Sequence, residues 1–149
     1  MVIRKLNNDE IKSALDLAWN VFLKFEAPDY SQDGVDEFNR SIHDPQYLNM
    51  LQLYGAFDGK KIVGMIATRS SGKHIALFFV DGKHQGQGVG RKLFTQICAQ
   101  SSSEKITVNS SPFAVPIYHH LGFTDTDTEQ ITNGLRYTPM EYNLEKGLS

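Results

Sequence analysis

The sequence predicts one mixed α+β domain that spans residues 1–149. Three observations carry this prediction. Apolar residues near the N-terminus recur at helical spacing, the next segment changes to strand-like runs separated by turns, and a glycine-rich segment then joins a strand to another helix. The length suits a single domain, and 40% hydrophobic with 21% charged residues is a globular composition.

Two helices are expected before the strands. Asn7 is followed three positions later by Glu10, a capping-box pattern that predicts a helix start. The apolar stripe of this helix runs to about Phe25, and residues 26–31 are expected to form a loop. A second, weaker stripe ends at Asp44, because the residue before a proline disfavours the α conformation.

Three strands are expected next. Leu51–Phe57 and Ile62–Thr68 are rich in strand-forming residues, and Asp58-Gly59 between them indicates a tight hairpin turn. His74–Val80 is a nearly continuous apolar run, which predicts a strand buried on both faces. Together these segments predict an antiparallel meander.

The C-terminal half alternates helices and strands. The expected elements are a helix from about Val89 to Gln100, a strand at Ile106–Asn109, a helix at Pro112–Leu121 capped by Gly122, and a last strand or hairpin within Ile131–Leu144.

Charge and composition exclude several classes of protein. Fifteen basic against seventeen acidic residues give a net charge of −2, so no broadly basic surface for nucleic acid is expected. The lone Cys98 cannot form an intramolecular disulfide, which favours a reducing compartment. The longest apolar run, Ile75 to Val80, is far shorter than the roughly 18 residues of a membrane span. We therefore expect a cytoplasmic protein with no membrane association.

The segment between the third strand and the next helix predicts an anion site. Glycines at positions 82, 86, 88 and 90 let successive backbone N–H groups turn toward one point, and the following helix N-terminus favours a phosphate. A tight turn that simply needs glycine is the alternative interpretation. The Walker loop and the dinucleotide fingerprint both fail, because Arg91 stands where each requires glycine.

Two motifs carry a family resemblance. Gln85-x-x-Gly88-x-Gly90 resembles the pyrophosphate loop of the GNAT superfamily, the acyl-CoA-dependent N-acetyltransferases. Downstream, Asn109 at a strand end and Tyr118 four residues before Gly122-Phe123 are similar to the second signature of that family. The resemblance implies the GNAT fold, in which a mostly antiparallel twisted sheet is splayed at the cofactor site and flanked by helices.

The resemblance also implies an activity, the transfer of acetyl from acetyl-CoA directly to a primary amine of a small molecule or peptide. The residues that it places at the cofactor are Phe79, Val80, Gln85, Gly86, Gln87, Gly88, Val89, Gly90, Arg91 and Asn109. The backbone N–H of Phe79 or Val80 would polarise the thioester carbonyl. Arg91 is equally readable as a solvated surface arginine, and Asn109 as the cap of the next helix.

Tyr118 is the first catalytic candidate, because the family places a tyrosine here beside the cofactor sulfur. A phenol of pKa about 10 donating to a thiolate of pKa about 8.5 is unfavourable by roughly 2 kcal/mol, so a hydrogen bond to the leaving thiolate is expected rather than full proton transfer. A core tyrosine that anchors the helix is the alternative.

The resemblance implies that two loops contact the acceptor, and a general base is expected among their acidic residues: Glu26, Asp29, Asp125, Asp127 and Glu129. Glu26 is preferred because it ends an apolar helix face, where burial would raise its pKa. Solvated carboxylates, with water as the base, are the alternative. No metal site is predicted, because the adjacent His119 and His120 point about 100° apart on a helix. Cys98 is expected to be a small core residue.

Two rival functions stay open at this point. One is a catalytically silent acyl-CoA-binding sensor or partner module, and the other is a protein for a different phosphate ligand. The identity of the amine is not predicted, and a homodimer is left open because edge strands of such a sheet can pair between subunits.

Overall fold

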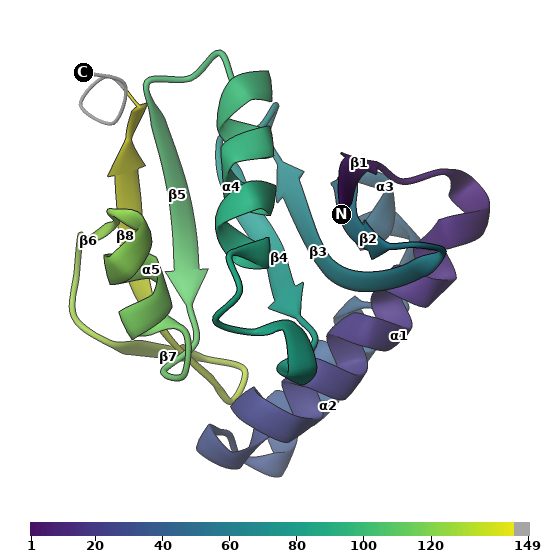
Figure 1. Cartoon of the computed structure of the whole chain (residues 1–149). Helices are drawn as coiled ribbons and strands as arrows, with labels where there is room; N and C mark the ends of the chain where they lie inside the picture. The colour runs from purple at the N-terminus through teal and green to yellow at the C-terminus, as the bar shows by residue number, and fades with distance from the viewer. Residues whose placement is uncertain (145–149) are drawn as a thin grey trace.

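A twisted eight-stranded sheet separates two layers of helices (Figure 1) in the computed structural model, which describes residues 1–144. The strands are β1 (Val2–Lys5), β2 (Gln52–Asp58), β3 (Lys61–Arg69), β4 (His74–Val80), β5 (Lys105–Ser110), β6 (Thr124–Asp125), β7 (Gln130–Thr132) and β8 (Leu135–Asn143). Their order in the sheet is β1-β2-β3-β4-β5-β8-β6, and β7 pairs with β8. All pairs are antiparallel except β4 with β5. The expected mixed α+β class and mostly antiparallel sheet are confirmed.

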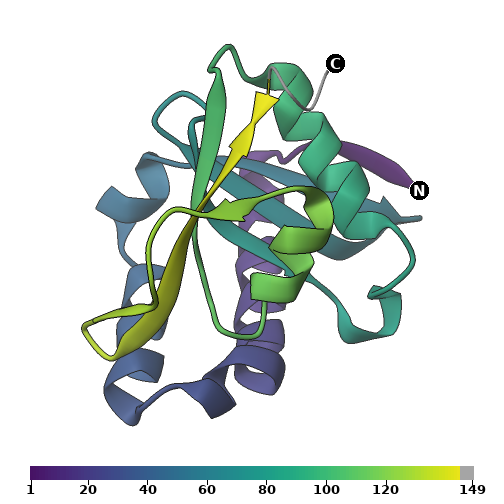
Figure 2. The same cartoon turned by 90° about the vertical axis from the view of Figure 1, so that its left-hand side faces the viewer.

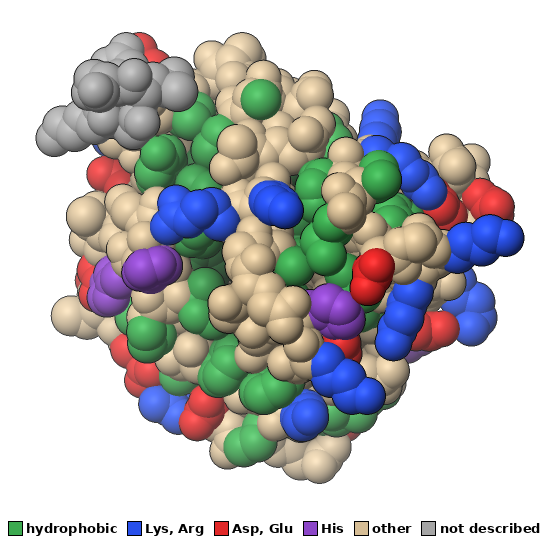
Figure 3. All heavy atoms as spheres, viewed as in Figure 1, with side chains coloured by type: hydrophobic (Ala, Val, Ile, Leu, Met, Phe, Trp, Pro, Cys, Tyr) green, Lys and Arg blue, Asp and Glu red, His purple; other side chains and the backbone are tan. Residues whose placement is uncertain are grey.

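Each face of the sheet has its own hydrophobic core. The helices are α1 (Ile11–Val21), α2 (Gln32–Ser41), α3 (Pro45–Asn49), α4 (Val89–Gln100) and α5 (Val115–Leu121). Helices α1 and α2 cover one face, and α4 and α5 cover the other. On the face that carries α4 and α5, basic and acidic side chains are interspersed (Figure 3). No helix within residues 1–144 is both long and apolar enough to cross a bilayer.

The N-terminal helical segment extends further than the sequence predicts. The backbone N–H of Asn7 donates to Glu10 Oε1 at 2.8 Å, as expected for the start, and a short 3-10 turn, η1 (Asn8–Glu10), leads into α1. After α1 the chain widens into a π-helical turn, η2 (Phe22–Glu26), and then a 3-10 turn, η3 (Ala27–Asp29). The expected loop at 26–31 was therefore wrong for residues 26–29. π-helical turns are rare and are frequent at functional sites.

The central meander is confirmed, but β4 differs from the expectation. Its burial alternates along the strand, so Ile75, Leu77 and Phe79 are buried and the residues between them are partly exposed. The prediction of a strand buried on both faces was wrong, because most of β4 is not paired with β5 and cavities lie beside it. The apolar residues of β4 thus line cavities as well as contribute to the core.

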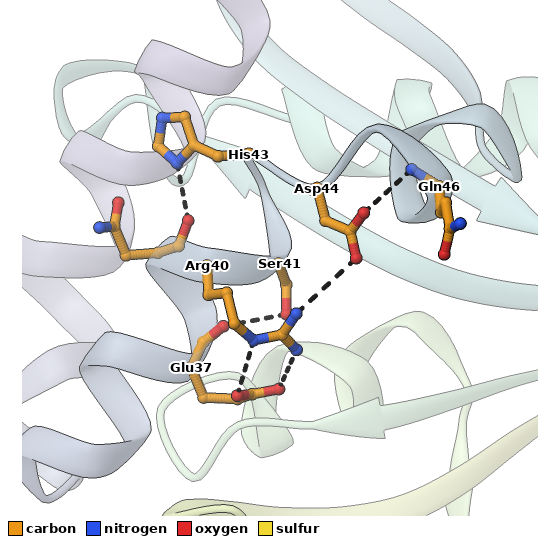
Figure 4. Close-up of polar contacts among 7 residues, drawn as sticks. Glu37, Arg40, Ser41, His43, Asp44 and Gln46 are labelled. Atoms are coloured by element: carbon orange, nitrogen blue, oxygen red, sulfur yellow. Dashed lines mark hydrogen bonds and ion pairs between the residues drawn. The ribbon is translucent and has the colours of Figure 1, made fainter.

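Three short elements were missed by the sequence reasoning: β1, α3 and β6. Each has five residues or fewer, which is too short for a repeating apolar pattern to be recognised. Asp44 was expected to end a helix, and it also begins the next one, since its side chain accepts from the Gln46 backbone N–H at 3.0 Å. Figure 4 shows this cap at the junction of α2 and α3.

The sheet splits between β4 and β5. The two strands pair only at His74 with Thr107 and at Ile75 with Val108, and they then diverge toward their C-terminal ends (Figure 1). On the other side β4 stays paired with β3, and the Asp81 N–H donates to the Val63 carbonyl at 2.9 Å. Because backbone groups alternate in direction along a strand, the N–H groups of Phe78 and Val80 point away from β3 toward the split.

The hairpin of β7 and β8 packs against α2 and the η3 turn (Figure 2). A Cβ atom on Gly34 would clash with the Gly134 carbonyl, so the two backbones touch where no side chain fits. Nearby, Arg136 Nη1 donates to the Asp29 carbonyl at 3.1 Å. The hairpin thus forms a wall opposite the N-terminal helices, on one side of the split.

Candidate active site

The glycine-rich segment forms the predicted strand–loop–helix turn. β4 is followed by a 3-10 turn, η4 (Gly82–His84), and then by Gly86 and Gly88, whose φ angles are +75° and +84°. Residues with a side chain rarely adopt such φ angles, which explains why glycine occupies both positions. Gly88 is the N-cap of α4, so the unpaired amides of the first helical turn begin directly after it.

One side chain fastens this loop to the end of β4. Gln85 Nε2 donates to the Val80 carbonyl at 3.0 Å. That carbonyl faces the split in the sheet, where β5 no longer supplies a partner. The first residue of the Gln-x-x-Gly-x-Gly motif therefore has a structural role, which is to hold the loop at the edge of the split.

The loop, the end of β4 and α5 enclose a cavity of about 510 Å³. Of the ten residues expected at the cofactor, seven line it: Phe79, Val80, Gln85, Gly86, Gly88, Gly90 and Arg91. Gln87 and Val89 do not line it, since Gln87 is exposed and Val89 is buried in the core. Arg91 is exposed at the rim, where its Nη2 donates to the His120 carbonyl at 3.2 Å.

Asn109 lies elsewhere. It lines a second cavity of about 440 Å³, on the other side of the split. Nor does it cap α5, because the N-cap of this helix is Ala114 and, among residues 1–144, no side chain hydrogen-bonds its first turn. The alternative that Asn109 caps this helix was therefore wrong.

The second cavity is the more polar of the two. Its walls come from the η2 turn, α2, α3, the splayed parts of β4 and β5, and the β7–β8 hairpin. Five residues line both cavities: Glu26, Phe78, Phe79, Ala114 and Tyr118. These residues mark the place where the two cavities meet, and two of them are the catalytic candidates predicted from the sequence.

Glu26 ends the π-helical turn at this junction. Burial raises the pKa of its carboxyl to about 7, the Ser111 hydroxyl lowers it in part by hydrogen bonding, and the nearby Asp29 raises it. A carboxylate with a pKa close to neutral pH is both ionised often enough and basic enough to accept a proton. Glu26 therefore combines a position where both cavities meet with a pKa that suits proton exchange near neutral pH.

Ser111 and Tyr30 complete the surroundings of Glu26, and the sequence reasoning missed both. Burial raises the pKa of the Tyr30 phenol well above its usual range, and the neighbouring Glu26 raises it further. Ser111 also hydrogen-bonds Tyr30. The one available signal was a pair of serines directly after a strand end, and serines are common in any turn.

Tyr118 is buried in the wall between the cavities. Its ring packs edge-on against Phe78 and Phe123, with centroid distances of 5.9 and 5.1 Å. Burial raises the pKa of its phenol far above the usual range, and the charge of Glu26 adds to this effect. The phenol therefore keeps its proton and can act as a hydrogen-bond donor. Tyr118 therefore packs in the core and also lines the candidate site.

The other acidic candidates do not line either cavity. Asp125 binds His119 at 2.6 Å, Asp127 accepts from Gln130 at 3.0 Å, and Glu129 pairs with Arg136 at 3.2 Å. Within residues 1–144, His, Cys, Asp and Glu side chains form no cluster of three or more that could hold a metal ion.

Comparison with known families agrees with this geometry. The sequence pattern of the acetyltransferase (GNAT) domain matches residues 26–144, from the η2 turn through β8. The chain belongs to the GNAT family of acetyltransferases. It is thus an acyltransferase, and the predicted resemblance is confirmed.

Solved structures with the GNAT fold superpose on nearly the whole chain. A GCN5-related N-acetyltransferase from Rhodopseudomonas palustris is 18% identical, with a TM-score of 0.82 over 95% of this chain and 94% of that one. The PaiA N-acetyltransferase from Thermoplasma acidophilum, in complex with coenzyme A, is 16% identical, with a TM-score of 0.76 over 95% and 98%. Apo YjaB from Escherichia coli is 21% identical, with a TM-score of 0.74 over 95% and 98%. No curated protein sequence matches the chain.

Proposed function

We propose that this GNAT enzyme transfers acetyl from acetyl-CoA directly to a primary amine of a small molecule or peptide. The observation that carries the proposal is the junction of the two cavities, where Glu26 and Tyr118 meet. A direct transfer needs two substrates to approach one point from different sides. A proton acceptor and a hydrogen-bond donor at that point supply what the two reacting groups need.

On the cofactor side, the diphosphate of acetyl-CoA would bind the loop between Gln85 and Arg91. The amides of the first turn of α4 supply donors and positive potential there without any formal charge. The N–H of Val80, which points into the split, would donate to the thioester carbonyl as negative charge develops on its oxygen. The coenzyme A complex of the similar PaiA enzyme supports this cosubstrate.

On the acceptor side, the amine must lose a proton before it attacks. An alkylammonium of pKa about 10.4 is neutral in about one molecule in 2,500 at pH 7, a cost of about 4.6 kcal/mol. We assign Glu26 as the base that accepts this proton, because its raised pKa and its place at the junction both suit the role. The amine nitrogen then forms a bond to the acetyl carbon.

The tetrahedral intermediate collapses by breaking the carbon–sulfur bond. The leaving thiolate carries the negative charge, and the Tyr118 phenol donates a hydrogen bond to it while keeping its own proton. Attack by the neutral amine leaves a second surplus proton on the nitrogen, and this proton is lost to solvent as the amide forms. The proton held by Glu26 passes to the thiolate, which returns the carboxylate to its ionised form. The acetylated amine, free coenzyme A and one proton leave.

A thiol-release assay with acetyl-CoA and a panel of polyamines, amino acids, aminoglycosides and peptides tests this proposal. We expect release of coenzyme A with at least one amine, and a loss of at least about 100-fold in kcat/KM in Glu26→Gln. Calorimetry with acetyl-CoA runs in parallel. Binding of acetyl-CoA without turnover on any amine would identify a silent acyl-CoA-binding module and overturn the enzymatic proposal. A cytoplasmic location and a homodimer stay predictions, which cell fractionation and sedimentation would test.

A further inference from the structure

The polar cavity contains a cation that the proposed chemistry does not use. Four charged side chains line this cavity: Glu26, Glu37, Arg69 and Arg136. Glu26 is already assigned to the amine. The other three determine which further charges an acceptor would contact inside the cavity.

Two of these three are paired with neighbouring side chains. Glu37 Oε1 lies 2.6 Å from Arg40 Nη2, and Figure 4 shows Arg40 lying between Glu37 and Asp44. Arg136 pairs with Glu129 at 3.2 Å and donates to the Asp29 carbonyl. Each of these two cavity-lining side chains therefore has an ion-pair partner of opposite charge.

Arg69 differs from them. It ends β3, it is partly buried, and within residues 1–144 its guanidinium has no hydrogen bond or ion pair. Its electrostatic neighbours are Tyr47 of α3 and His74 of β4. Burial and the charge of Arg69 lower the pKa of His74 to about 4, so the imidazole is neutral at pH 7 and the phenol of Tyr47 is neutral too. This end of the cavity therefore carries one uncompensated positive charge.

A partly buried cation without a partner is unfavourable, and a carboxylate is the group that guanidinium binds best. The opposite end of the cavity holds Glu26, which suits an amine. We propose, on the basis of the function proposed above, that the acceptor is dipolar: its amine lies at Glu26 and a carboxylate at its far end binds Arg69.

The sheet sets the distance between the two ends. Arg69 pairs in register with His74 at the start of β4, whereas Glu26 shares the junction with Phe79 near its end. Five residues of strand span about 16 Å, at about 3.3 Å per residue. The side chains of Arg69 and Glu26 both reach into this gap and shorten it. We expect the acceptor to be a short peptide or an extended amino acid, because its amine and carboxylate must reach both ends, whereas an α-amino acid carries both groups on one carbon.

Matched acid and amide acceptors test the inference. Thiol release is measured with 6-aminohexanoate and its amide, with triglycine and its amide, and with glycine and its amide. We expect the wild-type enzyme to prefer the two longer acids over their amides by about tenfold or more in kcat/KM, mainly through KM, and to show no such preference with glycine. Arg69→Gln should reduce the preference to about one, and Arg69→Lys should retain part of it.

Arg4→Gln is the matched control, because Arg4 pairs with Glu10 away from both cavity linings, and it should keep the preference. Equal use of acids and amides by the wild type, or a preference that survives in Arg69→Gln, overturns the inference. Calorimetry with 6-aminohexanoate on the protein saturated with coenzyme A gives a second readout that needs no turnover. No binding of the acid overturns the role of Arg69, whereas failure of every amine to release thiol overturns the proposed function instead.

Discussion

The charge of Glu26 raises the pKa of the Tyr118 phenol, and both side chains line the junction of the two cavities. The carboxyl titrates near pH 7, whereas burial keeps the phenol protonated well above that. Two negative charges at one place are unfavourable, so an ionised Glu26 holds the proton on Tyr118 more firmly. Glu26 can therefore accept a proton under conditions in which Tyr118 can only donate a hydrogen bond.

Replacing Tyr118 with phenylalanine removes this donor and leaves most of the ring packing intact. A hydrogen bond to a charged group contributes about 1.5–3 kcal/mol, so we expect kcat to fall by about 10- to 100-fold. The Kd for acetyl-CoA should change little, because the thiolate forms only during the reaction. Tyr142→Phe is the control, since Tyr142 packs against Phe94 and Phe123 outside both cavities and should keep normal turnover. Normal turnover in Tyr118→Phe would exclude the assigned role.

The pH dependence of the reaction tests Glu26. As a base with a pKa of about 7, its carboxyl is protonated and inactive below neutral pH, so kcat/KM should rise about tenfold per pH unit up to about pH 7. Glu26→Gln should lose this limb together with most of the activity. Asp127→Asn, on an exposed residue that lines neither cavity, should keep the wild-type profile. An unchanged acidic limb in Glu26→Gln would assign the titration to another group.

The same carboxyl links stability to pH. Its pKa is raised from 4.5 in the unfolded chain to about 7 in the fold, so between these values the folded state holds a proton that the unfolded state has lost. The free energy of unfolding therefore decreases as pH rises from about 4.5 to 7, by up to about 3 kcal/mol from this group. Glu26→Gln should melt at a higher temperature than the wild type at pH 8, and the difference should vanish near pH 4. Equal melting temperatures at pH 8 would show that the carboxylate is not desolvated.

The contact of Gly34 with Gly134 predicts a selective effect on the acceptor. Alanine favours a helix over glycine by about 1 kcal/mol, but a Cβ at position 34 meets the Gly134 carbonyl, a backbone atom that cannot rotate away. We expect Gly34→Ala to shift the hairpin, to lower the melting temperature, and to raise KM for the amine more than KM for acetyl-CoA. Asp36→Ala, on an exposed residue of the same helix, is the control for changes in helix propensity. Equal changes in both KM values would show that the hairpin does not shape the acceptor cavity alone.

The sequence predicted the features whose cause is local. Positive φ angles at Gly86 and Gly88 and the helix end at Gly122 depend on a few neighbouring residues, so their spacing was sufficient to place them. Glu26 could be anticipated because it ends an apolar helix face. The π-helical turn that orients Glu26 could not be predicted from the spacing of apolar residues.

The rest depends on contacts between segments that are far apart in the chain. Ser111 matters because Glu26 approaches it. Arg69 stands out because, among residues 1–144, Glu37 and Arg136 in the same cavity have ion-pair partners and Arg69 has none. Neither fact is contained in the local pattern around the residue. Asn109 shows the converse, since its motif position was recognised but its side chain faces the polar cavity rather than the cofactor cavity.

Variants at Gly88 and Gly59 distinguish an effect on backbone strain from an effect on cofactor binding. Both have positive φ angles, +84° and +63°, and a Cβ at either would meet no other atom within 4 Å. Alanine at either position should therefore cost about 1–2 kcal/mol of stability, because the left-handed conformation is unfavourable for a residue with a side chain. Gly59 lies in the hairpin turn between β2 and β3, whereas Gly88 lines the cofactor cavity and begins α4.

Calorimetry with acetyl-CoA and thermal melting distinguish the two effects. Gly59→Ala should melt at a lower temperature and bind acetyl-CoA with an unchanged Kd. Gly88→Ala should melt similarly low but bind at least about tenfold more weakly, because its methyl group projects into the space that the diphosphate would occupy and its strained backbone turns the first amides of α4 away. Equal affinity in the two variants would show that the diphosphate binds somewhere other than this loop.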